Sequence, residues 1–144
     1  MPMSRRQFSL LAGGALIAGH SRRTEAAPAR AIRIVLAPSS LGLRPEDGRE
    51  PGTWEAPQVL MAAGLRDAVR AAEVVGLDHP PYQVPAQAGT RIRNGQTLRR
   101  FSLELAEHVR ETIAALRFPL VIGGDCGVLL GCLVLHGILR ARMR

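Results

Sequence analysis

Three short apolar runs along the chain predict buried β-strands. Residues 31–37 form a β-branched run that is closed by Pro38 and two serines. Residues 73–77 and 120–122 repeat the signal in shorter form, and Gly, Asp or Pro bounds each of them. Runs of this length and composition, bounded by turn-forming residues, are typical of strands.

Helix-period segments separate these runs. Between residues 55 and 72 the apolar positions recur every three or four residues, which predicts a helix. Residues 97–116 give the clearest helix, because one face collects Leu98, Phe101, Leu105, Val109, Ile113 and Leu116. Residues 128–139 are apolar on nearly every side, which predicts a helix buried on more than one face. The Gly- and Pro-rich residues 42–52 and 79–96 are expected to be loops.

The alternation of strand and helix predicts an α/β fold. Such an order implies right-handed crossovers and a three-layer arrangement, with a parallel sheet covered by helices on both faces. Three strands make a narrow sheet, and the last strand and helix keep apolar surface that calls for another strand. We therefore expect residues 31–144 to form about half, the N-terminal half, of a larger doubly wound domain.

A membrane-spanning helix over residues 120–139 is the competing interpretation of the apolar C-terminal stretch. Asp125 and His136 lie inside it, and an ionised Asp costs about 3 kcal/mol on insertion. Gly123 and Gly124 would also interrupt the helix. No stable membrane span is therefore expected.

Residues 1–30 have the order of an export signal. Arg5 and Arg6 form a twin-arginine pattern, Phe8 to Gly19 is mildly apolar, and small residues follow at 26–29. The apolar part is shorter than the roughly 20 residues that span a bilayer. We expect a twin-arginine-type signal peptide and a periplasmic or secreted protein.

Composition narrows the choice of partner. The chain has 144 residues, a formal net charge of +7 and an apolar fraction of 47%, and all 19 basic residues are Arg. These arginines are spread along the sequence and are not interleaved with aromatic residues, which make up 3%. Nucleic-acid binding usually needs a clustered basic face, so no nucleic-acid partner is expected.

The segment after the third strand carries the most informative chemistry. Gly123 and Gly124 suit a sharp turn from strand to helix, and Asp125 and Cys126 follow at once. In open α/β sheets, binding sites lie at the carboxyl ends of the strands. Cys126 is either a metal ligand or a small buried thiol. Asp125 could approach Asp78, which also ends a strand, to hold a cation, or each could cap a turn.

Cys132, His136 and His79 are further residues whose side chains could bind a metal or take part in catalysis. Cys132 is most consistent with a core position, and no Cys-x-x-Cys motif is present. His136 lies in the apolar helix pattern and is either a metal ligand or a core histidine. His79 lies in a strand-end loop, where a histidine is either functional or simply exposed.

These motifs resemble the arginase/agmatinase/formiminoglutamase (ureohydrolase) family. That family has Gly-Gly-Asp-His-Ser where this chain has Gly-Gly-Asp125-Cys126-Gly. The family's opening strand, its Pro/Ser/Gly turn and its Gly-x-x-Glu-x-Pro segment are matched by residues 31–42 and 52–57. The resemblance covers residues 31–136 and implies an arginase-like fold.

The resemblance also implies metal-dependent hydrolysis of guanidino, amidino or formimino C–N bonds. The family uses two bridged divalent metal ions, usually manganese, which activate a bridging water. Cys126 stands at the position of a ligand His, so it is the candidate metal residue, although thiolate favours zinc, iron or copper. For Asp125 we expect a supporting or structural role. The family's later motifs, Asp-Ala-His-x-Asp and Ser-x-Asp-x-Asp, do not occur, and Asp125 is the last acid in the sequence.

We therefore expect a truncated ureohydrolase that is inactive alone, with a small guanidino or amidino substrate if it is active. Two alternatives remain. One is a non-catalytic exported module that pairs with another chain or forms an oligomer. The other is a soft-metal binder that acts through Cys126. Substrate, metal and oligomeric state are left open by the sequence.

Overall fold

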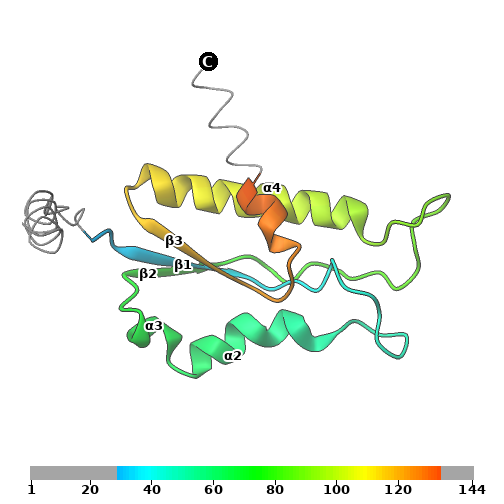
Figure 1. The fold of residues 1–144 in the computed structure, drawn as a ribbon, viewed down its shortest axis with the longest axis horizontal. Coiled ribbons are helices and arrows are strands. Elements are labelled where there is room, and N and C mark those ends of the chain that lie inside the picture. Colours follow the sequence, from blue (N-terminus) through cyan, green and yellow to red (C-terminus); the bar gives the residue numbers. More distant parts are fainter. Residues whose placement is uncertain (1–28, 134–144) are drawn as a thin grey trace, which may run out of the picture.

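A parallel sheet of three strands forms the centre of the protein. The computed structural model describes residues 29–133. Strand β1 (Ile32–Ala37) lies between β2 (Glu73–Gly76) and β3 (Phe118–Gly123), so the order is β2-β1-β3 (Figure 1). Both pairings are parallel, and β1 is aligned with β3 from Ile32 opposite Phe118 to Ala37 opposite Gly123.

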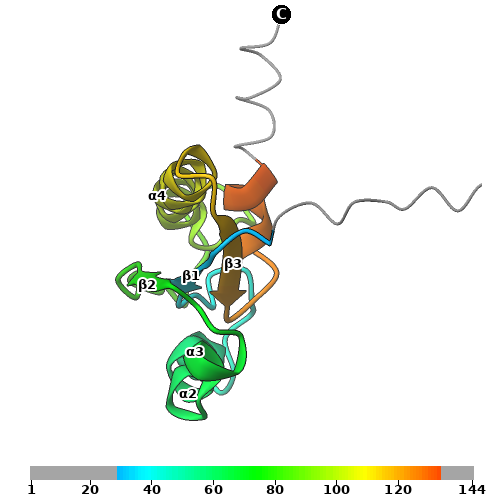
Figure 2. The same ribbon diagram turned by 90° about the vertical axis from the view of Figure 1, so that its left-hand side faces the viewer.

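Helices cover both faces of this sheet. The 3-10 helix η1 (Gly52–Glu55) leads into α2 (Ala56–Ala62) and α3 (Leu65–Ala68), and these two helices lie on one side. Helix α4 (Gly95–Ala114) and the helical residues 128–133 lie on the other (Figure 2). The structure therefore confirms the three-layer α/β architecture that the sequence predicts.

The predicted helix over residues 55–72 is interrupted. Gly64 takes the left-handed conformation, with φ of 88°, and separates α2 from α3. That conformation ends one helix and begins the next, and it suits glycine because glycine has no Cβ. Arg70 is also left-handed, with φ of 51°, and turns the chain toward β2. The predicted apolar face is only partly confirmed, because Val59 and Leu60 are exposed while Leu65 and Val69 are half-buried. The apolar spacing also does not reveal where the backbone becomes left-handed.

The core is formed where α4 packs on the sheet. Val35 and Leu105 are fully buried, and Phe101 and Val109 lie within the same cluster. The predicted apolar face of α4 is thus confirmed for most of its length. Two residues of that face, Ile113 and Leu116, are exposed. Ile113 lies in the last turn of α4, and Leu116 lies beyond its end at Ala114, in a left-handed turn.

The apolar stretch that begins at Leu120 is not one continuous helix. Its first residues belong to β3, a turn follows at Gly124, and residues 128–133 are helical. The prediction that this helix is buried on more than one face is wrong for its described part, because Leu129, Leu130 and Leu133 are exposed. Within residues 29–133, no helix has the length and apolar character needed to cross a membrane.

Candidate functional site

The carboxyl ends of the three strands bring the candidate residues to one edge of the sheet. Ser39 and Ser40 follow β1, His79 follows β2, and Asp125 follows β3. This is the edge where ligands bind in open α/β sheets. It is built from three turns that lie far apart in sequence.

The Asp125 carboxylate joins two of these turns. Its Oδ2 accepts hydrogen bonds from the Gly42 N–H at 3.1 Å and from the Ser39 hydroxyl at 3.4 Å. Its Oδ1 accepts one from the Gly127 N–H at 2.5 Å. The carboxylate is therefore occupied in holding the turn after β1 against the turn after β3, and its oxygens are directed at protein donors.

Gly123 and Gly124 are required by close packing and not by a left-handed backbone, since neither has positive φ. A Cβ on Gly124 would collide with the carbonyl oxygens of Ser39 and Thr53, the latter at 2.5 Å. A Cβ on Gly123 would meet the Val128 side chain. The sequence located the turn correctly but gave the wrong reason for its glycines.

A second cluster centres on Glu50. Its Oε1 accepts a hydrogen bond from the Ser40 hydroxyl at 2.5 Å and lies 2.9 Å from His79 Nε2. The His79 ring stacks on Trp54, with centroids 4.2 Å apart and planes 22° from parallel. His79 is thus held on both sides and is not a free loop histidine.

This second cluster is not arranged for nucleophilic attack. A serine nucleophile needs a base within hydrogen-bond reach of its hydroxyl, and an acid on the far side of that base. Here Glu50 lies between Ser40 and His79, so the serine donates to the acid. The arrangement ties the loop before η1 to the ends of β1 and β2.

The two cysteines differ in environment. Cys126 is exposed, which excludes the buried-thiol interpretation, whereas Cys132 is half-buried and packs against the core, as expected. Burial raises the pKa of the Cys132 thiol. Because β1 separates β2 from β3, Asp78 and Asp125 do not form the carboxylate pair considered above. His136 and the Arg5-Arg6 pair lie outside the described residues.

A two-metal centre needs several converging ligands, and the described residues do not provide them. Within residues 29–133, no group of three or more His, Cys, Asp or Glu side chains could hold a metal ion. Asp125 is bonded to three protein donors, and Cys126 projects alone. The residues present therefore do not fit a manganese pair.

The sequence analysis missed Glu50 and the serines of the first turn as parts of this edge. Ser39 and Ser40 could have been found, since they directly follow a predicted strand. Glu50 lies in a loop and reaches the edge only through the folded path of residues 42–52. No local sequence pattern predicts that Glu50 lies at this edge of the sheet.

Comparison with known proteins identifies the fold. No protein-family model matches the chain, and no curated protein matches it significantly. An arginase from Bacillus subtilis matches with a TM-score of 0.53 and 22% identity, over 76% of this chain and 34% of that one. The arginase from Bacillus caldovelox matches with a TM-score of 0.54 and 25% identity, over 71% of this chain and 36% of that one. A further arginase structure, from Bacillus subtilis subsp. subtilis str. 168, matches with a TM-score of 0.55 and 23% identity, over 74% of this chain and 35% of that one.

The chain therefore has an arginase-like fold and spans about a third of the length of the arginases that it matches. The sequence had suggested about half of a domain. A similarity at this level of identity shows the fold, and activity has to be argued from the site itself.

Proposed function

We propose that this chain is related to the ureohydrolases and contributes one part of a hydrolase for guanidino, amidino or formimino C–N bonds. The observation that carries the proposal is the strand order β2-β1-β3 with Gly-Gly-Asp125-Cys126 at the carboxyl end of β3. The similarity to three arginase structures supports it. The ligand position of the family motif then falls at the sheet edge, where Cys126 is exposed.

On its own, the chain is expected to have no turnover. The described residues offer Cys126 without converging ligands for a metal ion. The direct test is to assay the 144-residue chain on arginine, agmatine and formiminoglutamate with added manganese. Release of urea, or of formamide from formiminoglutamate, at enzymatic rates would overturn this expectation.

A chimera tests the relationship itself. Residues 31–133 would replace the matching third of the Bacillus subtilis arginase, once with Cys126 and once with Cys126→His. If the two sheet edges are equivalent, the Cys126→His chimera should release urea from arginine and the Cys126 chimera should release much less. Two folded chimeras without activity, or failure of both to fold, would count against the relationship.

The alternative is an interaction module, and the open side of β3 favours it. Phe118 donates its N–H to Ala31 of the neighbouring segment, so the alternating pattern directs the N–H groups of Val121 and Gly123 away from β1. Such an edge can accept another strand. Nearby, Leu129, Leu130 and Leu133 on the described part of the last helix are exposed.

Light scattering after size-exclusion chromatography separates the two proposals. A soluble dimer or heteromer favours the module, whereas aggregation favours an incomplete enzyme. Leu129→Glu should dissociate a dimer formed through this side. Ile92→Glu is the matched control, because both residues are 58% exposed but Ile92 lies in the loop before α4.

We further propose twin-arginine export to the periplasm or medium, which rests on Arg5 and Arg6 in the sequence. Replacing both by Lys should retain the precursor in the cytoplasm, as detected by fractionation and immunoblotting. Unimpeded export of that variant would refute the proposal.

A further inference from the structure

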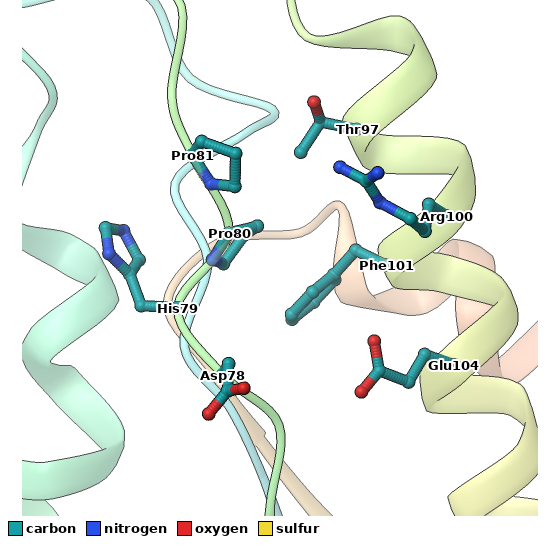
Figure 3. Close-up of a pocket in the computed structure, with 8 residues that line it drawn as sticks. All are labelled: Asp78, His79, Pro80, Pro81, Thr97, Arg100, Phe101 and Glu104. Carbon is teal, nitrogen blue, oxygen red and sulfur yellow. The ribbon is translucent and has the colours of Figure 1, made fainter.

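A small cavity lies between the segment after β2 and the first half of α4. Its volume is about 160 Å³. Pro80 and the buried Phe101 form apolar walls, and three charged side chains surround the opening: Asp78, Arg100 and Glu104 (Figure 3). None of these residues takes part in the Asp125 or Glu50 clusters.

The charges around the cavity are opposite in sign and are not paired. Arg100 and Glu104 lie one turn apart on α4, and both point toward the segment after β2 (Figure 3). The ion pairs formed among residues 29–133 include neither of them, nor Asp78. The His79 ring points away from the cavity and stacks on Trp54. The charged groups around the cavity are therefore those of Asp78, Arg100 and Glu104.

We propose that this cavity binds a small zwitterion, namely a short amino acid. Its carboxylate would bind the Arg100 guanidinium, which is suited to planar anions, and its ammonium group would lie between Asp78 and Glu104. Phe101 and Pro80 would contact the short carbon skeleton between the two charges. A ligand that carries both charges would complement the signs of these three exposed side chains.

Size and charge favour a short zwitterion over simpler ligands. A cavity of about 150 Å³ holds benzene, so this one suits roughly six non-hydrogen atoms, as in alanine. A simple anion would face two carboxylates, and a simple cation would leave Arg100 without a partner. A longer amino acid such as arginine would extend beyond this volume, so we place this site apart from the hydrolase activity proposed above.

The test is a titration of the ¹⁵N-labelled 144-residue chain with alanine and β-alanine, followed by ¹H–¹⁵N spectra. Saturable shifts confined to residues 78–81 and 97–104 are expected. The dissociation constant should be on the order of millimolar, because a small ligand gains little binding free energy at a partly exposed site. Acetate and ethylamine, which carry one charge each, should give no saturable shifts at the same concentrations. Absence of saturation by either amino acid, or equal binding of acetate, would overturn the proposal.

Matched variants locate the site. Arg100→Gln and Glu104→Gln should each weaken alanine binding about threefold to fivefold, since the charges are solvent-exposed, and the double variant should abolish it. Arg99→Gln is the control, because Arg99 is the neighbouring arginine of α4 but lines a different groove. An equal loss in Arg99→Gln would point to general charge effects and refute the assigned site. Amide dispersion in the same spectra reports whether each variant is folded.

Discussion

The two ends of the sheet are held together in different ways. At the amino end, Arg33 forms ion pairs with Glu73 at 3.4 Å and with Glu111 at 3.8 Å, and Arg117 also bonds to Glu73. At the carboxyl end, Asp125 bonds to backbone and hydroxyl donors, and the backbone of Gly124 contacts two carbonyl groups.

This difference predicts unequal tolerance to substitution. Glu73, Glu111 and Arg117 are partly exposed and can exchange partners, and ion pairs of this kind contribute about 0 to 1 kcal/mol each. Only Arg33 is largely buried there, with its side chain 12% exposed. The contacts at the carboxyl end involve short groups and backbone atoms that cannot move without shifting a strand. The end that carries the candidate site should therefore be the more sensitive of the two.

Gly124→Ala should have the largest effect. The added Cβ would overlap the carbonyl oxygens of Ser39 and Thr53, which belong to the backbone and cannot swing aside. Overpacking of this kind costs about 3 kcal/mol, so the free energy of unfolding should fall by that amount. Urea denaturation followed by circular dichroism measures it.

Gly52→Ala is the matched control for that variant. Gly52 begins η1, and a Cβ there would meet no atom within 4 Å. The free energy of unfolding should change by no more than about 0.5 kcal/mol. Equal destabilisation by both substitutions would show that the close approach at Gly124 is not the cause.

Asp125→Asn should have the next largest effect. One oxygen of Asp125 accepts hydrogen bonds from the Gly42 N–H and the Ser39 hydroxyl, and the other accepts one from the Gly127 N–H. In asparagine an NH₂ group replaces one of these oxygens, so at least one of the three donors would lose its acceptor. A hydrogen bond to a charged group contributes about 1.5 to 3 kcal/mol, so the loss should fall in that range. Denaturation in urea gives the value, and Asp67→Asn on the exposed side of α3 serves as control. No loss on Asp125→Asn would mean that the carboxylate does not hold the two turns together.

The same contrast explains how far the sequence could be interpreted. The three strands and most of the apolar face of α4 follow from periodicity, because each depends on residues close together in the chain. The parallel pairing follows from the alternation of strands with helices. The break at Gly64 was missed because one left-handed residue leaves the apolar spacing almost unchanged.

The candidate site was predictable only in part. Asp125 was located at a strand end, but its partners come from the turn after β1, more than eighty positions away in sequence. Glu50 contacts Ser40 and His79 only because the loop before η1 folds back over the ends of β1 and β2. Contacts of this range are set by the tertiary path of the chain and leave no local pattern.

Glu73→Gln tests the amino end and should have a smaller effect. Glu73 and Arg117 are partly exposed, and Arg33, the largely buried second partner of Glu73, keeps its ion pair with Glu111, so the loss should be about 1 kcal/mol. Because salt screens exposed charges, the difference from the wild-type chain should largely vanish at about 1 M NaCl. Unfolding midpoints at low and high salt give both values. If Glu73→Gln lowers the free energy of unfolding by more than Asp125→Asn does, also in high salt, the amino end is the more sensitive of the two, contrary to the prediction.

Thiol alkylation perturbs the structure least and compares two sites within eight residues of the carboxyl-end turn. Cys126 is exposed, whereas Cys132 is half-buried and burial raises the pKa of its thiol. A raised pKa means less reactive thiolate at neutral pH, so iodoacetamide should modify Cys126 about tenfold faster or more, as measured by peptide mass spectrometry. The rate at Cys132 should continue to climb at alkaline pH as its thiolate forms. In denaturant the two rates should converge, because unfolding removes the burial of Cys132. Faster modification of Cys132 in the folded chain would contradict the packing of the last helix against α4, and with it the position of the turn that carries Asp125.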